Sequence, residues 1–246
     1  MPVAADEMAR RLSLPRVALY HEVGSTLDIA HELAAAGALA GTLVIADAQT
    51  AGRGRLGRAW RSEPNAGVWL TMIERPSDPT ALETLSLRIG LAVAPRLDQL
   101  AESAVRLKWP NDLYVGERKL GGILIEARWR EGRPEWVAIG LGINLRPPDI
   151  EMRAVGLRPG VGREEVLDRI VPAIRAAVGM NGDLTRDELT EFAKRDFAAG
   201  RPCLEPAVGV VRGIDSTGAL LVDVTSRGTK EATVIRAGSL VFREDR

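Results

Sequence analysis

The segment QTAGRGRLGRAW, residues 49–60, discriminates between two folds and organises the rest of the chain. The G-x-G-x-x-G spacing of its glycines matches the dinucleotide-binding fingerprint, which needs a strand before the glycines and a helix that starts at the last one. Residues 42–49, TLVIADAQ, predict the strand, but residues 60–67, WRSEPNAG, predict turn and loop. The sequence therefore argues against a Rossmann fold.

The chemistry of this glycine/arginine loop, residues 49–60, favours an anionic ligand. Its glycines allow close approach of the backbone to a ligand. Its arginines, Arg53, Arg55 and Arg58, present rigid forks of donors that suit phosphate and carboxylate. Trp60 ends the loop and is available to cover a flat ring. We expect a mobile loop that becomes ordered around an anion.

Length and composition bound the function class. The chain has 246 residues, which fits one large domain and a small one at about 100–200 residues per domain. The formal net charge is zero, so no bulk electrostatic attraction to nucleic acid or membranes is expected. The single cysteine, Cys203, excludes an intramolecular disulfide and a cysteine-based zinc site. With no apolar run of about 18 residues and no signal peptide, we expect a cytoplasmic protein.

The apolar patterns predict a sheet with helices around it. Either Ser25 or Thr26, which follow Gly24, is expected to be the N-cap of the helix at 27–37. The strand at residues 135–145 carries Gly140 and Gly142 on one face, where bare backbone accepts either a packed neighbour or a ligand. Both histidines, His21 and His31, are interpreted as ordinary surface or partly buried residues. The predicted strands lie at 16–23, 42–49, 67–74 and in a meander over 105–145, and the predicted helices at 27–37, 82–100, 163–179 and 185–199.

Four blocks of this sequence together resemble the bacterial biotin–protein ligases, the biotin–[acetyl-CoA-carboxylase] ligases. The blocks are GRGRLGRAW at 52–60, KWPND at 108–112, RKLGGILIE at 118–126 and GLGINL at 140–145. They occur in the family's order and at about its spacing, and GIDSTGALLV at 213–222 also fits. The resemblance extends from about residue 16 to the end of the chain.

The resemblance implies an α+β fold in two domains. Residues 1–199 are expected to form a mixed, largely antiparallel sheet flanked by helices, similar to class II synthetases. Residues 200–246 are expected to form a small SH3-like β-barrel. The implied activity joins biotin to ATP as biotinyl-5′-AMP and then to a lysine of a biotin carboxyl carrier domain. The implied cofactors are ATP, Mg²⁺ and the substrate biotin, with no metal site made by the protein.

The resemblance also assigns roles to particular residues. Those implied to be catalytic are Arg53, Arg55, Lys108, Asp112 and Lys119, with Asp112 orienting the acceptor lysine or accepting its proton. Those implied to bind biotin are Ser25, Thr26, Gln49, Gly52, Arg53, Arg55, Lys119, Gly122, Gly140 and Gly142. Those implied to bind ATP are Arg55, Arg58, Trp60, Lys108, Asn111, Lys119 and Asn144.

Two departures and two alternatives accompany this hypothesis. Leu27 follows Ser25-Thr26 where the family often has Asn, and Gly121 stands where Ala is common. The alternatives are a lipoate–protein ligase and a non-enzymatic biotin-binding regulator. The fifteen residues before the first strand are too few for a winged helix-turn-helix, so no operator binding is expected. The sequence leaves open whether the protein forms a homodimer.

Overall fold

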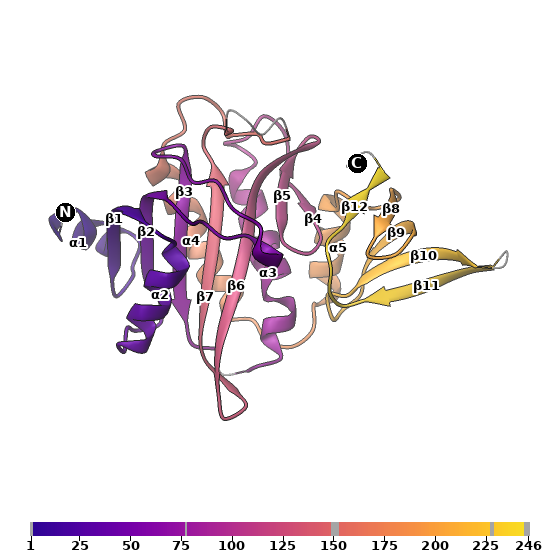
Figure 1. Ribbon diagram of the computed structural model, residues 1–246, viewed down its shortest axis with the longest axis horizontal. Coiled ribbons are helices and arrows are strands. Elements are labelled where there is room, and N and C mark those ends of the chain that lie inside the picture. Colours follow the sequence, from indigo (N-terminus) through magenta and orange to yellow (C-terminus); the bar gives the residue numbers. More distant parts are fainter. Residues whose placement is uncertain (1, 77, 149–152, 227–228, 244–246) are drawn as a thin grey trace.

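The protein folds around two sheets, which Figure 1 shows side by side. The structure is a computed structural model that describes residues 2–76, 78–148, 153–226 and 229–243. The larger sheet has seven strands in the order β1-β2-β3-β7-β6-β5-β4. Its strands are β1 (Val17–Val23), β2 (Thr42–Gln49), β3 (Gly67–Glu74), β4 (Arg106–Lys108), β5 (Asp112–Val115), β6 (Arg118–Arg130) and β7 (Arg133–Asn144).

Strand pairing makes this sheet mixed but largely antiparallel, as predicted. Only β1 and β2 pair in parallel among its described neighbours, across the crossover helix that joins them. Strands β4 to β7 follow one another as the predicted meander. The glycine/arginine loop leaves the end of β2 and leads into strand β3; its helical segment is a single 3₁₀ turn, Arg55–Gly57, and no helix starts at its last glycine. The expectation against a Rossmann fold is therefore confirmed.

Helices cover both faces of the larger sheet. Helix α2 packs on β2, β3 and β7 through Leu27, Ala30 and Ala34, while α3 and α4 pack against each other over the opposite face. The helices are α1 (Pro2–Arg11), α2 (Thr26–Ala35), α3 (Ala81–Leu97), α4 (Arg163–Val178) and α5 (Arg186–Arg195).

Helix α2 starts where the sequence predicts, because Ser25 caps it. The Ser25 hydroxyl accepts a hydrogen bond from the Leu27 backbone N–H at 3.3 Å, which satisfies one free donor of the first turn. This cap fixes the helix directly beneath the glycine/arginine loop. Asp28 lies in its first turn, where a carboxylate is favourable beside the helix N-terminus.

The C-terminal segment forms a second, antiparallel sheet of five strands. Its order is β11-β10-β9-β8-β12, and no hydrogen-bonded pairing joins β11 to β12 in the described residues. The sheet is therefore open as described, and the predicted closed barrel is not confirmed. Its strands are β8 (Pro202–Glu205), β9 (Gly209–Ile214), β10 (Leu220–Ser226), β11 (Thr229–Ile235) and β12 (Val241–Phe242).

The second sheet packs against the KWPND end of the first. The buried Trp109 indole N–H donates to the Gly218 carbonyl oxygen at 3.0 Å. Phe242 of β12 stacks near Phe197, with ring centroids 5.9 Å apart. Within the described residues, no helix is long and apolar enough to cross a membrane.

Candidate active site

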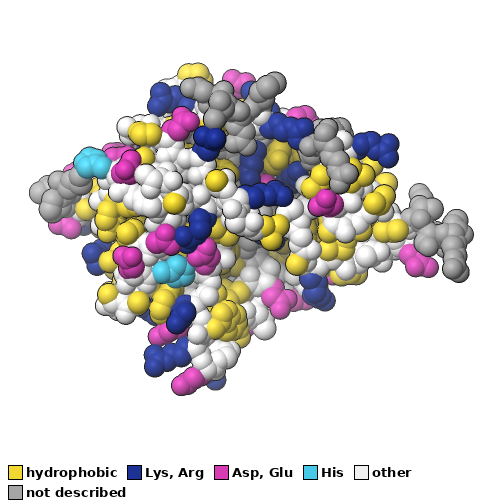
Figure 2. Space-filling view, viewed as in Figure 1, with side chains coloured by type: hydrophobic (Ala, Val, Ile, Leu, Met, Phe, Trp, Pro, Cys, Tyr) yellow, Lys and Arg dark blue, Asp and Glu magenta, His cyan; other side chains and the backbone are white. Residues whose placement is uncertain are grey.

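A cavity of about 440 Å³ lies between the glycine-rich strands, the glycine/arginine loop and the C-terminal sheet. In Figure 2, Lys and Arg side chains surround the hollow between the main body and that sheet. Of the site residues predicted from sequence, Thr26 and Gly52 alone do not line the cavity. Those that do are Ser25, Gln49, Arg53, Arg55, Arg58, Trp60, Lys108, Asn111, Asp112, Lys119, Gly122, Gly140, Gly142 and Asn144.

The glycine/arginine loop folds back on itself as an irregular hairpin. The backbone N–H of Trp60 donates to the Gly52 carbonyl oxygen at 2.8 Å, and the backbone N–H of Gly54 donates to the Arg58 carbonyl oxygen at 2.8 Å. A Cβ at Gly52 would lie 2.5 Å from the Trp60 carbonyl oxygen, so only glycine fits where the two limbs meet. The turn at Leu56 and Gly57 has φ values of 57° and 72°. Arg53 therefore lies in the first limb of the hairpin, and Arg55 lies at the start of its turn.

A hydrogen-bonded cluster closes the base of the loop. Thr26 donates to the Gln49 Oε1 through its backbone N–H at 2.8 Å and through its hydroxyl at 3.1 Å. The Gln49 Nε2 donates to the Ser62 hydroxyl at 2.7 Å. The Thr71 hydroxyl donates to that of Thr26 at 2.8 Å. Thr26 therefore orients Gln49 from below the cavity.

The floor of the cavity is bare backbone covered by two apolar side chains. A Cβ at Gly142 would lie 2.6 Å from the Trp60 Nε1, and one at Gly140 would lie 3.3 Å from a Leu27 methyl group. The sequence left open whether this bare face contacts a packed neighbour or a ligand. In the structure, the side chains of Trp60 and Leu27 pack on it. The Trp60 Nε1 is buried without a hydrogen-bond partner among the described residues. That unsatisfied donor is a polar group in want of an acceptor.

Lys119 and Asp112 form an ion pair at one wall of the cavity. The Lys119 Nζ lies 2.7 Å from the Asp112 Oδ1 and 5.1 Å from the centre of the Trp60 ring. Both side chains flank Gly122, whose added Cβ would lie 3.3 Å from Asp112 and 3.7 Å from the Lys119 Nζ. The pair therefore places one cation and one carboxylate beside the glycine floor.

The loop arginines differ in their surroundings. The Arg53 Nη1 lies 2.6 Å from the Asp28 Oδ1, and its Nη2 lies 3.3 Å from the Glu126 Oε2. The Arg55 Nη1 donates to the Gly238 carbonyl oxygen at 3.1 Å and lies 3.5 Å from the Asn111 Oδ1. No carboxylate of the described residues pairs with Arg55. Arg58 is exposed at the cavity rim.

The environment moves the pKa of the two arginines in opposite directions. Burial lowers the pKa of Arg55, and the neighbouring Arg58 acts in the same direction, against the attraction of Asp112. Burial also acts to lower the pKa of Arg53, but the hydrogen bond to Asp28 and the charge of Glu126 outweigh it, so that this pKa is raised. Arg55 therefore brings to the cavity a half-buried cation that no carboxylate of the described residues pairs with, whereas the charge of Arg53 is matched.

Two further predicted nucleotide-side residues, Lys108 at the end of β4 and Asn144 at the end of β7, also line the cavity. The Lys108 Nζ lies over two aromatic rings, 4.7 Å from the centre of Phe242 and 5.5 Å from that of Tyr114, in cation–π geometry. Asn144 is buried, and its side-chain amide donates to the Val155 carbonyl oxygen at 3.2 Å. Phe242 thus connects the C-terminal sheet to a predicted catalytic lysine.

The structure adds lining residues that the sequence interpretation missed. Ser239, Leu240 and Val241 of the C-terminal sheet form part of the cavity wall, and Leu124 and Leu141 lie beside the glycines. Residues 239–241 carry no chemical motif, so only the tertiary packing brings them to the site, whereas Leu124 and Leu141 belong to two of the quoted blocks but were not singled out. His31, interpreted as ordinary, hydrogen-bonds to Glu126 at the outer side of Arg53.

Comparisons with known proteins agree on one family. Residues 24–144 match the model of the biotin/lipoate A/B protein ligase family. The chain is 40% identical over 159 residues to the bifunctional ligase/repressor BirA of Bacillus subtilis, a match that covers 61% of this chain but only 48% of that protein. The chain thus spans about half the length of that relative.

A second relative is matched over most of its length. The biotin–[acetyl-CoA-carboxylase] ligase of Mycobacterium tuberculosis is 31% identical over 238 residues, which cover 89% of this chain and 86% of that protein. Among solved structures, biotin protein ligase from Aquifex aeolicus in complex with biotin and ATP superposes with a TM-score of 0.73 at 26% identity. That superposition covers 92% of this chain and 97% of the other.

Proposed function

This chain belongs to the biotin/lipoate A/B protein ligase family, and on that premise we propose that it attaches biotin to a lysine of a carrier domain in two ATP-dependent steps. The observation that carries the proposal is the cavity itself, where bare glycine backbone lies beneath a loop of arginines and beside Lys119. The Aquifex structure that holds biotin and ATP supports the same ligand pair.

In the first step, a biotin carboxylate oxygen attacks the α-phosphorus of ATP. The bond from that phosphorus to the bridging oxygen breaks, which releases pyrophosphate and leaves biotinyl-5′-AMP. The two reactants are both anions, so the site has to offset their repulsion. Arg55 and Lys119 offer cations on two sides of the glycine floor, and preorganised charges of this kind are the largest single contribution in many active sites.

The glycine/arginine loop then protects the product. Biotinyl-5′-AMP is a mixed anhydride that water hydrolyses, and a closed loop excludes water. We infer that Trp60 gives up its place over Gly142 to cover the nucleotide, which would also offer its unsatisfied N–H an acceptor. The ureido ring of biotin would lie on Gly122 and Gly140, with Ser25 and Gln49 at its edge.

In the second step, the lysine amine of the carrier attacks the acyl carbon of the anhydride. The bond from that carbon to the phosphate oxygen breaks, AMP leaves, and the amine loses a proton. Asp112 is the single carboxylate among the described residues that line the cavity, which supports it as the group that orients the amine or accepts this proton.

The donor set bears on the implied Mg²⁺. Magnesium is usually held by one or two carboxylates together with substrate phosphates. A lone carboxylate in the described lining fits Mg²⁺ that arrives on ATP, and Asp112 is the residue that would help to hold it. When bound, the ion supplies neutralisation of phosphate charge.

The remaining parts of the hypothesis are proposals of the same kind. We propose that residues 1–199 are the catalytic domain and that 200–246 are an SH3-like domain that helps to dock the carrier or ATP; the contact from Arg55 to Gly238 supports a role near the nucleotide. The name of the Mycobacterium relative supports acetyl-CoA carboxylase, or a related carboxylase, as the source of the carrier. A cytoplasmic location, the absence of operator binding and the oligomeric state remain predictions.

One incubation tests the proposed function. The protein is mixed with Mg-ATP, labelled biotin and a biotin carboxyl carrier domain, with a carrier whose acceptor lysine is replaced by arginine as the control. We expect label only in the unaltered carrier and one pyrophosphate released per biotin. Incorporation of lipoate in place of biotin would identify the other branch of the family, and biotin binding without incorporation would identify a regulator.

A further inference from the structure

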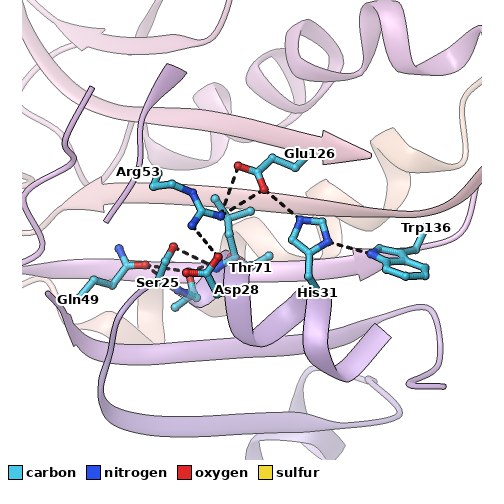
Figure 3. A network of polar contacts seen from close by, with 10 residues as sticks. Ser25, Asp28, His31, Gln49, Arg53, Thr71, Glu126 and Trp136 are labelled. Atoms are coloured by element: carbon cyan, nitrogen blue, oxygen red, sulfur yellow. Dashed lines mark hydrogen bonds and ion pairs between the residues drawn. The ribbon is translucent and has the colours of Figure 1, made fainter. Parts of the chain in front are cut away.

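Arg53 lies between two carboxylates that come from separate elements (Figure 3). Asp28 reaches it from the first turn of helix α2, and Glu126 reaches it from strand β6. The Arg53 Nη1 is 2.6 Å from Asp28, and its Nη2 is within 3.5 Å of both Glu126 oxygens. One limb of the glycine/arginine loop is thereby tied to the helix and to the sheet at once.

A second layer of hydrogen bonds orients Glu126. The Trp136 Nε1 lies 2.9 Å from the His31 Nδ1, and the His31 Nε2 lies 3.0 Å from the Glu126 Oε2. An indole N–H can only donate, so the His31 Nδ1 accepts and the His31 Nε2 carries the proton that is donated to Glu126. Figure 3 shows the resulting chain from Trp136 through His31 and Glu126 to Arg53.

The charges of this cluster bear on the loop more than on the whole fold. The exposed fractions of the side chains are 36% for Arg53, 51% for Asp28 and 32% for Glu126. Ion pairs this accessible contribute little to global stability. The Arg53 charge, however, is already matched, so an anion in the cavity gains less from Arg53 than from Arg55. The cluster is therefore suited to anchoring the loop while it closes.

We propose that Asp28 and Glu126 are positioning residues: they hold the first limb of the loop at Arg53 so that the turn that carries Arg55 closes over the ligand, and His31 and Trp136 orient Glu126. This inference rests on the proposed function where it concerns retention of biotinyl-5′-AMP. The tether itself is a property of the loop and is measurable without any substrate.

Amide hydrogen exchange of residues 50–60 tests the tether in the ligand-free protein. We expect exchange to be about 3- to 10-fold faster in Glu126→Gln and Asp28→Asn than in the unaltered protein. Trp136→Phe removes the indole donor and should give a smaller change in the same direction. Glu135→Gln is the matched control, because Glu135 pairs with Arg130 at 3.3 Å at the far end of the β6–β7 hairpin.

A double-mutant cycle with Arg53→Ala separates positioning from general destabilisation. If the carboxylates act through Arg53, Glu126→Gln accelerates loop exchange in the unaltered background and has no further effect when Arg53 is Ala. The half-life of bound biotinyl-5′-AMP should shorten about 2- to 5-fold in the same single variants. Loop exchange that is unchanged in both carboxylate variants, or an undiminished Glu126→Gln effect in Arg53→Ala, would overturn the proposal.

The proposed ligase activity and the tether at Arg53 can be refuted independently of each other. If the unaltered protein makes no biotinyl-5′-AMP, the proposed function is wrong, while the exchange measurement still decides whether the tether exists. If the protein is active but the exchange rates do not respond to Glu126→Gln and Asp28→Asn, the tether is wrong and the proposed function is untouched.

Discussion

Arg53 lies in the first limb of the glycine/arginine loop and Arg55 lies two residues later at the start of its turn, and the surroundings of these two identical side chains differ. Arg53 contacts the carboxylates of Asp28 and Glu126 at 2.6 and 3.3 Å. Arg55 contacts a backbone carbonyl oxygen at 3.1 Å and otherwise faces the cavity. The pKa of Arg53 is raised by its carboxylates against the effect of burial, and the pKa of Arg55 is lowered by burial.

This difference indicates how one motif serves two purposes. A guanidinium between two carboxylates is a structural fastening, because its charge is already matched. A half-buried guanidinium with only neutral acceptors is destabilised, and an anionic ligand relieves that cost. Sequence motifs treat the two arginines as equivalent, and only the folded neighbourhood distinguishes them.

The largest effect is expected from the cation opposite the loop. Lys119→Ala should lower the rate of adenylation by about 10²–10³-fold, the usual loss when one preorganised charge is removed. Transfer from pre-made biotinyl-5′-AMP to the carrier should change little. Separate assays of the two half-reactions check this, with Lys194→Ala as a control, because Lys194 pairs with Glu191 on the surface. Equal loss in both half-reactions would refute the phosphate-side assignment of Lys119.

Arg55→Ala should release the adenylate prematurely. Hydrogen bonds to charged groups contribute about 1.5–3 kcal/mol, which corresponds to about 10- to 100-fold faster escape. The measurement is AMP formed in the absence of carrier, together with the half-life of the bound intermediate. If the variant retains biotinyl-5′-AMP as tightly as the unaltered protein does, Arg55 does not seal the cavity.

Gly142→Ala should displace Trp60 from the cavity floor. The added methyl group would lie 2.6 Å from the indole nitrogen, and overpacking of this kind costs about 1–3 kcal/mol. We expect biotin affinity to fall about 10-fold, measured by calorimetry. Gly162→Ala is the control, since nothing lies within 4 Å of its added methyl group. Unchanged affinity would mean that the glycine floor does not contact the ligand.

Arg53→Ala should have the smallest effect of the series. Accessible ion pairs contribute about 0.2–1 kcal/mol, so adenylate retention should shorten by no more than about 5-fold. Measured beside Arg55→Ala under the same conditions, this variant tests the comparison directly. A larger loss of adenylate retention from Arg53→Ala than from Arg55→Ala would reverse the roles of the two arginines.

Much of the larger sheet follows from local pattern. Residues 42–49 and 67–74 are continuous apolar runs bounded by turn residues, and they match β2 and β3 to the residue. The cap by Ser25 is also confirmed. The topology of the C-terminal sheet is less accessible, because its short strands pair by contacts that no local signal specifies.

The residues of the candidate site also differ in whether local sequence predicts them. Its glycines, loop arginines and KWPND residues belong to recognisable motifs, and the structure gathers nearly all of them around one cavity. The partners of Arg53 are distant in the chain: Asp28 belongs to no motif and is 25 positions away, and Glu126, the last residue of the RKLGGILIE block, is 73 positions away. His31 and Trp136 are 105 positions apart. Such contacts exist only after folding, so sequence patterns do not predict them.

The central claim is that Arg55 closes over the ligand while Arg53 stays fastened to the sheet. A crystal structure of the complex with biotinyl-5′-AMP tests it most directly. We expect the Arg55 guanidinium to lie within hydrogen-bond distance of the ligand phosphate or acyl oxygen, with Arg53 still paired to Asp28 and Glu126. Arg55 turned toward solvent, or Arg53 detached from both carboxylates and bound to the phosphate, would contradict it.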